Sequence, residues 1–231
     1  MFRLENVVKT YARHGQAVTA FRCSDLSIAT GEYVAILGPS GSGKTTLLSL
    51  LGGMLSPTEG RVWIEGRSLY DLSVAQRAQL RRESLGFVFQ TFNLVPYLTA
   101  LENVQIPLCL AGLPAGQQSE RAEAALSRFG LAERLRHKPC ELSVGQQQRV
   151  ALARTLVSNP RVILADEPTG NLDPESRELV LNSLGECREE GRTVIMVTHD
   201  PVAAARAGRV LQLNQGRLED SGGSAPQPVA A

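Results

Sequence analysis

The chain has 231 residues, enough for one large domain or for one domain with a sizeable insertion. A composition of 43% hydrophobic and 20% charged residues is ordinary for a globular protein, and a net charge of +1 argues against the strongly basic face of a nucleic-acid-binding protein. No apolar run approaches the roughly 20 residues of a membrane-spanning helix, and the N-terminus lacks a signal-peptide core. The four cysteines follow no metal or disulfide spacing. We therefore expect a cytosolic protein with reduced thiols, which reaches a membrane only through a partner.

The first third of the chain predicts strands. Residues 31–37 form a continuous apolar run before a Gly-rich turn, which is typical of a buried parallel strand. Segments around 2–8, 20–28 and 61–66 are partly alternating and favour a half-exposed antiparallel sheet. After the turn, KTTLLSLLGG predicts a helix that stops at Gly52 and Gly53.

The remainder alternates between helices and strands. Apolar spacing predicts helices at 119–131 and 146–157, a strand at 161–166, a helix near 174–190 and a strand at 193–198. Two short strands about an Asn-Gln-Gly turn close the chain. The pattern predicts an α/β core with a mainly parallel sheet, comprising residues 1–90 and 159–220, an N-terminal antiparallel β subdomain and an inserted α-helical subdomain at about 91–158. Residues 221–231 are small and Pro/Gly-rich, which predicts a disordered tail.

A phosphate-binding loop is predicted between the strand at 31–37 and the following helix, because Gly38, Gly43, Lys44 and Thr45 match G-x-x-x-x-G-K-[ST] in full. Glycines here permit turns that direct successive N–H groups at phosphate oxygens, and the helix dipole adds to the attraction. Lys44 is expected to reach the β- and γ-phosphates and Thr45 to bind Mg²⁺, as in a P-loop NTPase. A Gly/Ser-rich surface turn is the alternative, which this context disfavours. The predicted ATP-binding loop comprises Gly38, Pro39, Ser40, Gly41, Ser42, Gly43, Lys44, Thr45 and Thr46.

An acidic pair, Asp166 and Glu167, follows the strand at 161–166. The carboxyl ends of strands are where α/β sheets present ligand groups. Asp166 is expected to hold Mg²⁺, and Glu167 to polarise a water for attack on the γ-phosphate. The alternative is an acidic pair that caps a helix. The phosphate loop upstream favours the first interpretation.

The segment LSVGQQQR has a structural explanation of its own, because Ser143 with Gln146 three residues later fits a capping box. A capped helix N-terminus with Gly145 beside it is also an anion site. The residues alone leave both interpretations open.

The motifs occur in an order that resembles the nucleotide-binding subunit of ABC transporters over about residues 1–220: GPSGSGKT, Gln90, LSVGQQQR, ILADEP, NLD and His199. In that family two subunits pack head to tail around two ATP molecules. The resemblance implies a homodimer in which Ser143, Gly145 and Gln146 of one copy face the γ-phosphate held by the other. The commonest family sequence is LSGGQ, and here Val144 replaces the first glycine. Val144 keeps its backbone N–H, so the motif is expected to work.

Four further residues acquire roles from the resemblance. Tyr11 is implied to stack on adenine, and Gln90 to sense both Mg²⁺ and the transporter partner. Asp173 is implied to bridge the two subunits. His199 is implied to hold the γ-phosphate and to help orient the attacking water, which makes it catalytic together with Glu167 and Lys44. Ordinary packing of an aromatic or polar side chain is the alternative for each.

The segments 50–60, 86–108 and 197–218 are similar to ATPases of the macrolide-efflux and lipoprotein-release branch. The resemblance implies an integral membrane permease partner with an extracytoplasmic domain, and a location on the inner face of the cell membrane. Phe92, Leu94, Val95 and Tyr97 are expected either to form a groove for a cytoplasmic helix of that partner or to pack inside the helical subdomain.

The function predicted is an ATP-hydrolysing motor that dimerises on ATP and drives a membrane protein. One alternative is a non-transport ABC ATPase of DNA repair or translation, but the long coiled coils, zinc insertions and paired cassettes usual there are missing from the sequence. Another alternative is a regulatory module with vestigial hydrolysis, which the intact Lys44, Asp166, Glu167 and His199 oppose.

Overall fold

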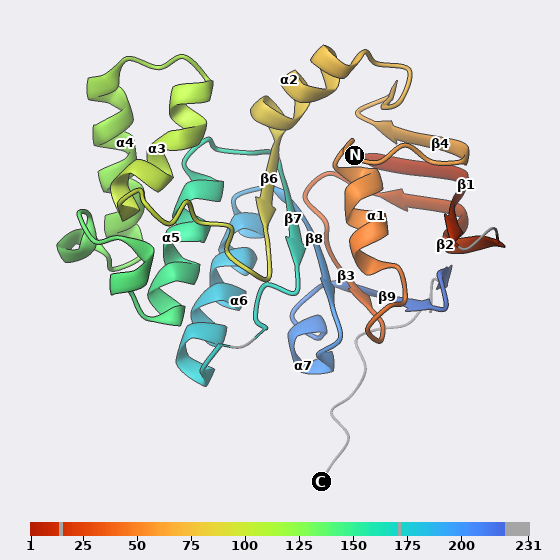
Figure 1. Cartoon of the computed structure of the whole chain (residues 1–231). Coiled ribbons are helices and arrows are strands. Elements are labelled where there is room, and N and C mark those ends of the chain that lie inside the picture. Colours follow the sequence, from red (N-terminus) through yellow and green to blue (C-terminus); the bar gives the residue numbers. More distant parts are fainter. Residues whose placement is uncertain (14–15, 171, 220–231) are drawn as a thin grey trace, which may run out of the picture.

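The computed structural model describes residues 1–13, 16–170 and 172–219 (Figure 1). The predicted disordered tail lies outside the described residues. Within them, no helix is both long and apolar enough to cross a membrane.

A ten-stranded sheet forms the centre of the described chain, in the order β5-β4-β1-β2-β10-β9-β3-β8-β7-β6. Its parallel part comprises β9 (Arg209–Asn214), β3 (Tyr33–Leu37), β8 (Thr193–Thr198), β7 (Val162–Asp166) and β6 (Leu85–Val88). The antiparallel part comprises β1 (Phe2–Arg13), β2 (Gln16–Ile28), β4 (Glu59–Ile64) and β5 (Arg67–Ser68), and β10 (Arg217–Glu219) joins β2 to β9. The predicted α/β fold, with a mainly parallel core and an N-terminal antiparallel part, is confirmed.

Helices cover both faces of the parallel strands. Their bounds are α1 (Lys44–Leu51), α2 (Val74–Ser84), α3 (Ala100–Leu110), α4 (Ala115–Arg128), α5 (Val144–Leu156), α6 (Pro174–Glu189) and α7 (Pro201–Ala204), with short 3₁₀ turns at Ala132–Arg134 and Pro139–Glu141. Alternate residues of a strand point to opposite faces. Val162 and Leu164 of β7 therefore pack into the core beside α1, whereas Ile163 and Ala165 pack into the core that contains residues of α5 and α6. This double burial explains why the strand is a continuous apolar run.

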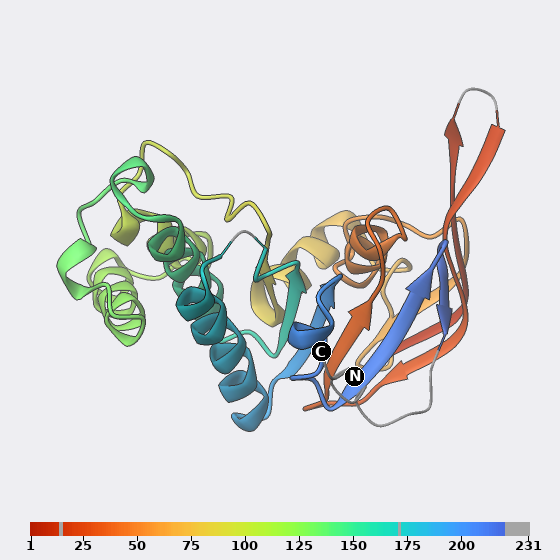
Figure 2. The ribbon, with the colours of Figure 1, turned by 90° about the horizontal axis from the view of Figure 1, so that it is seen from below.

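Helices α3 and α4 pack together against α5 at one end of the molecule, beyond the edge strand β6 (Figures 1 and 2). Helix α5 also contacts β6 and α6, so it joins this helical group to the sheet. The division of the chain into a core and a helical subdomain at 91–158 stays a prediction. The helical group itself starts only at Ala100, after an irregular segment.

Several elements differ from the sequence-based expectation, among them the short helix α7, which had not been predicted. Helix α2 had not been predicted, since it is largely polar and only Ser84 of it is buried. The strands expected near 2–8 and 20–28 are longer, and together they form a hairpin that projects well beyond the rest of the sheet (Figure 2). A register shift between Lys9 and Thr10 marks the start of this projection, consistent with the stronger twist that a β-bulge introduces.

Candidate active site

The phosphate loop connects β3 to α1 at the carboxyl end of the parallel strands. It runs so close to neighbouring backbone that side chains are excluded at two positions. A Cβ on Gly38 would lie 2.3 Å from the carbonyl oxygen of Leu213, and one on Gly43 would lie 2.3 Å from that of Ala20. Gly43 also has φ of 102°, which disfavours any residue with a side chain. These glycines are required by the path of the loop as well as by the chemistry of phosphate binding.

Lys44 is buried at the centre of the loop. Its Nζ donates to the carbonyl oxygens of Gly38 at 2.8 Å and Pro39 at 2.9 Å, and it forms an ion pair with Glu167 Oε1 at 3.3 Å. Nearby, the hydroxyl of Ser42 is buried and has no hydrogen-bond partner among the described residues. A buried polar atom without a partner is costly, so this hydroxyl suits a site that receives a polar ligand.

Glu167 is only 8% exposed, and its buried carboxylate makes four contacts. Besides the ion pair to Lys44, its Oε2 accepts from Thr198 Oγ1 at 3.2 Å and from the backbone N–H of His199 at 3.2 Å, and lies 2.9 Å from His199 Nδ1. Its φ of 46° is in the left-handed region, which costs a residue of this type about 1 kcal/mol or more. The surrounding contacts hold the carboxylate in this strained conformation, beside the phosphate loop.

Thr45 and Asp166 approach each other from α1 and β7, and the hydroxyl donates to Asp166 Oδ2 at 2.9 Å. Burial raises the pKa of Asp166, an effect that the hydrogen bond from Thr45 opposes and the charge of Glu167 reinforces. A hydroxyl and a carboxylate side by side are hard oxygen donors of the kind that Mg²⁺ prefers. The residues present therefore fit a magnesium ion.

These groups line one cavity of about 320 Å³, whose residues are Ala20, Ser40, Gly41, Gly43, Lys44, Thr45, Thr46, Gln90, Asp166 and Glu167. Gln90, which follows β6, thus lies beside the phosphate loop, and its role in sensing Mg²⁺ and the transporter partner stays a prediction. Ala20 of β2 was missed, because nothing in its sequence context distinguishes it from other strand residues. His199 lies on the opposite side of Glu167 and does not line this cavity.

Tyr11 lies on the projecting hairpin, is 42% exposed, and does not line the phosphate-loop cavity. The Nζ of Lys9 lies 5.3 Å from the centre of its ring. Its face is therefore accessible in part, and adenine stacking stays a prediction.

The segment LSVGQQQR forms the N-terminus of α5, and its capping box is confirmed. The Gln146 N–H donates to Ser143 Oγ at 3.3 Å, and the Ser143 N–H donates to Gln146 Oε1 at 3.0 Å. Val144 is 48% exposed, so its side chain does not disturb this arrangement. At this end of the helix Ser143 and Val144 are exposed, whereas Gly145 is buried.

Gly145 packs against the start of α6 in the same chain, where a Cβ would lie 2.1 Å from Ser176 Oγ. Asp173 caps α6 by accepting from the Ser176 N–H at 2.9 Å and from its Oγ at 2.7 Å. The bond from the Ser176 backbone, followed by that from its hydroxyl, lowers the pKa of Asp173. The predicted trans residues, Ser143, Gly145, Gln146 and Asp173, thus lie together in one chain and away from the phosphate loop of that chain.

Two buried polar residues that had not been singled out shape the surroundings of the site. Asn103 is fully buried and holds the segment after Gln90, with Oδ1 accepting from the Val95 N–H at 2.8 Å and Nδ2 donating to the Val95 carbonyl at 3.1 Å. Gln148 of α5 is fully buried and donates to the Pro168 carbonyl at 2.8 Å. The second bond ties α5 to the turn that follows Glu167. A buried Asn or Gln resembles an exposed one in sequence, so neither could have been found there.

A separate groove of about 610 Å³ involves α2, β6 and α3. Its apolar lining includes Met54, Phe87, Phe89, Ile106 and Leu110, and its cationic lining comprises Arg81, Arg82 and Arg154. The four residues expected to form a partner groove do not line it. Phe92 and Leu94 instead pack against the core, as the second alternative predicted, and Tyr97 is 73% exposed.

Comparison with known proteins places this geometry in context. A family profile described as ABC transporter matches residues 21–170. The macrolide export ATP-binding/permease protein MacB of Hyphomonas neptunium is 48% identical over 223 residues, covering 96% of this chain and 35% of that protein. MacB of Escherichia coli is 46% identical over 224 residues, with the same two coverages. The chain thus spans about 35% of the length of these curated relatives.

Two solved structures of MJ0796 are also similar, each with a TM-score of 0.89. One is the dimeric structure of this bacterial ABC transporter cassette, 44% identical, which covers 95% of this chain and 97% of its own. The other is a dimeric post-hydrolysis state bound to ADP and Pi, 43% identical with the same coverages. The macrolide-export similarity expected from the segments at 50–60, 86–108 and 197–218 is confirmed by the relatives.

Proposed function

The chain belongs to the ABC transporter family and is an ABC-type ATPase cassette, and from this premise we propose that it is a motor that drives a membrane permease. The observation that carries the proposal is the position of Glu167. Its carboxylate lies between Lys44 Nζ, at 3.3 Å, and His199 Nδ1, at 2.9 Å, next to the phosphate loop. A basic group held close to a phosphate-binding lysine is the arrangement that water activation requires.

In the proposed reaction, ATP and water give ADP, inorganic phosphate and a proton. The phosphate loop binds the β- and γ-phosphates through its backbone N–H groups and Lys44. Thr45 and Asp166 hold Mg²⁺, which neutralises negative charge on the phosphates when it is bound. Glu167 orients the attacking water and accepts its proton, and His199 fixes the carboxylate in position. Gln90 lies in the same cavity, where it can sense the nucleotide.

We propose further that two copies assemble head to tail on ATP. Ser143, Gly145 and Gln146 then approach the γ-phosphate held by the partner copy, with Asp173 between the subunits and Tyr11 on the adenine. The partly exposed N-terminus of α5 supports this, because a capped helix end away from its own phosphate loop is available to an anion on another molecule. The two solved dimeric cassette structures, 43% and 44% identical to this chain, support it as well.

We also propose a permease partner, because the relatives are ATP-binding/permease proteins. The groove beside α2, β6 and α3 offers an apolar surface for a cytoplasmic helix of that partner, and its three arginines favour one with carboxylates. We propose an extracytoplasmic domain on the partner and a location for this cassette on the inner face of the membrane. The comparisons are with transporters and do not support a role in DNA repair or translation.

The experiment that tests the proposed chemistry is ATP turnover by the purified protein with Mg²⁺. Glu167→Gln is expected to lower turnover by about 100- to 10,000-fold, the contribution typical of a positioned base. Glu123→Gln, on an exposed face of α4, is the matched control and should leave turnover unchanged. Equal turnover by Glu167→Gln and the unsubstituted protein would exclude the proposed role of Glu167.

A further inference from the structure

A second cavity of about 440 Å³ adjoins the phosphate-loop cavity, because both are lined by Gln90 and Glu167. Its other lining residues come from the turn after β7, from α6, and from the end of β8 through to the start of α7: Thr169, Gly170, Arg177, Thr198, His199, Asp200 and Pro201. A Cβ on Gly170 would lie 3.3 Å from Gln90 Nε2, so the amide of Gln90 is directed towards this side. The cavity therefore adjoins the proposed site of hydrolysis at Glu167 and extends from there to α6 and the segment after β8.

Arg177 is the cation of this cavity, and its hydrogen-bonding capacity is not used up. Its Nη1 forms an ion pair with Asp200 Oδ2 at 3.3 Å, whereas its Nε is buried and has no hydrogen-bond partner among the described residues. A guanidinium carries five N–H donors in a planar fork, so several stay available for another ligand.

The two carboxylates of the cavity are already engaged. Asp200 accepts from the Val202 N–H at 2.8 Å through its Oδ1 and pairs with Arg177 through its Oδ2. Glu167 is bound by Lys44 and by His199. An anion that enters the cavity therefore meets Arg177, the amide of Gln90 and the hydroxyl of Thr169, while the carboxylates keep its binding weak.

We propose that this cavity receives the inorganic phosphate produced by hydrolysis and that Arg177 binds it before it leaves. The proposal rests on the ATPase function above. Cleavage separates phosphate from ADP beside Glu167, and ADP closes the way back through the phosphate loop. A guanidinium matches the geometry of phosphate oxygens, which makes Arg177 the strongest phosphate donor in the cavity. Weak binding suits a product that has to depart.

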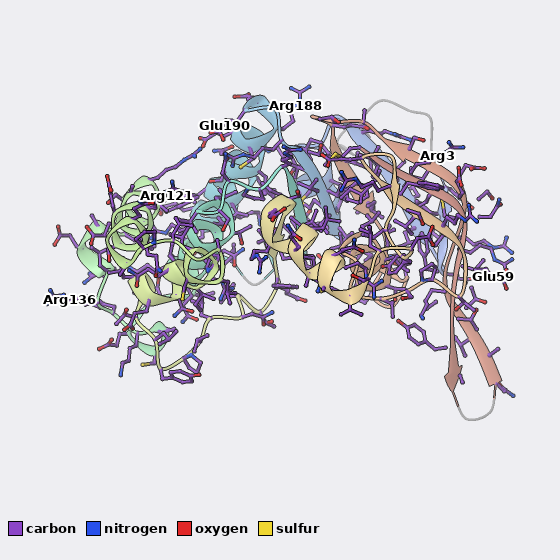
Figure 3. All side chains as sticks on the ribbon, turned by 90° about the horizontal axis from the view of Figure 1, so that it is seen from above. Arg3, Glu59, Arg121, Arg136, Arg188 and Glu190 are labelled. Carbon is purple, nitrogen blue, oxygen red and sulfur yellow. The ribbon has the colours of Figure 1, made fainter. Side chains whose placement is uncertain are left out.

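The test is inhibition of steady-state ATP turnover by inorganic phosphate. Arg177→Gln is expected to raise the half-inhibiting phosphate concentration about 10-fold, the loss of one charge-assisted hydrogen bond in a partly exposed site, with KM for ATP unchanged. Arg177→Lys should recover part of the effect. Arg188→Gln is the matched control on the same helix, since Arg188 projects from its far end into solvent, and it should inhibit like the unsubstituted protein (Figure 3).

Asp200→Asn separates phosphate binding from a structural role of the Arg177–Asp200 pair. If Arg177 binds phosphate, this variant frees the guanidinium and lowers the half-inhibiting concentration, opposite to Arg177→Gln. If the Arg177–Asp200 pair only holds the segment after β8 in place, both variants shift the half-inhibiting phosphate concentration in the same direction, and the proposal is wrong.

Thermal unfolding with ADP, Mg²⁺ and increasing inorganic phosphate gives a reading that does not need turnover. A phosphate-dependent rise in melting temperature that disappears in Arg177→Gln supports the site even if the protein hydrolyses no ATP, in which case the proposed function fails alone. The absence of any phosphate effect in both assays would overturn the site.

Discussion

Gly145→Ala tests how closely the N-terminus of α5 approaches α6 within one chain. The added Cβ would lie 2.1 Å from Ser176 Oγ and 3.1 Å from Ser176 Cβ. The hydroxyl must rotate away, which removes its 2.7 Å hydrogen bond to Asp173. That bond is exposed, so its loss costs about 1 kcal/mol, and the remaining crowding against the Cβ costs about 1 kcal/mol more. Alanine in place of glycine within α5 recovers about 0.5–1 kcal/mol of this cost. We therefore expect the free energy of unfolding to fall by about 1–1.5 kcal/mol.

Urea denaturation of a double-mutant cycle measures this contact. Ser176→Ala alone is expected to cost about 1 kcal/mol, and the double variant should lose about 1 kcal/mol less than the sum of the single variants, because the hydroxyl can be lost only once. Gly185→Ala in α6 is the control. Its Cβ would meet no atom within 4 Å, so it should stabilise the protein by about 0.5–1 kcal/mol. Additive single variants, or a Gly145→Ala as harmless as Gly185→Ala, would refute the close packing of α5 on α6.

Three further outcomes are expected. Burial raises the pKa of Asp166 in the folded protein above its value in the unfolded chain. The folded state is therefore favoured while the carboxyl is protonated, below the unfolded-state pKa, and this stability is lost as the pH rises through the folded-state pKa. Asp166→Asn should therefore raise the melting temperature of the nucleotide-free protein at about pH 7.5 more than at about pH 4, while Mg²⁺-dependent turnover falls about 100-fold or more; a lower melting temperature at neutral pH would contradict this. Asn103→Leu should lower the free energy of unfolding by about 2–3 kcal/mol in urea titration, because it leaves half-buried backbone groups of Val95 without their hydrogen-bond partner; a loss below about 0.5 kcal/mol would contradict a structural role of the Asn103 hydrogen bonds. Burial, and after it the charge of Asp25, raises the pKa of the Cys23 thiol to about 11. A thiol reagent at about pH 8 should therefore label Cys23 only after unfolding, whereas the exposed thiols of Cys109 and Cys140 should be labelled in the folded protein.

Local chemistry explains what the sequence predicted well. The phosphate loop is a short segment in which each glycine and the lysine act where they stand, so a contiguous motif was enough to find it. The capping box of Ser143 and Gln146 is local for the same reason. Ser73 and Gln76 form an identical box at the start of α2, and this signal could have revealed the helix whose weak apolar pattern concealed it.

Contacts between distant segments explain what the sequence alone left undetermined. Glu167 meets His199 because β7 and β8 are neighbours in the sheet, and the order of parallel strands cannot be read from apolar runs. The contact of Gly145 with Ser176 likewise depends on the packing of α5 beside α6. The residues that line the groove differ from those expected, because apolar residues after Gln90 can pack in the core or bind a partner equally well. Only the packing in the structure shows that Phe92 and Leu94 contact the core.

The central claim is that two copies close on ATP and that hydrolysis reopens them. Glu167→Gln tests it most directly, since this variant keeps the phosphate loop and the α5 N-terminus but cannot activate water. Light scattering during gel filtration with saturating ATP and Mg²⁺ should give a mass of twice the 24.9 kDa of one chain, and a single-chain mass without nucleotide. A mass of 24.9 kDa under both conditions would contradict the head-to-tail dimer.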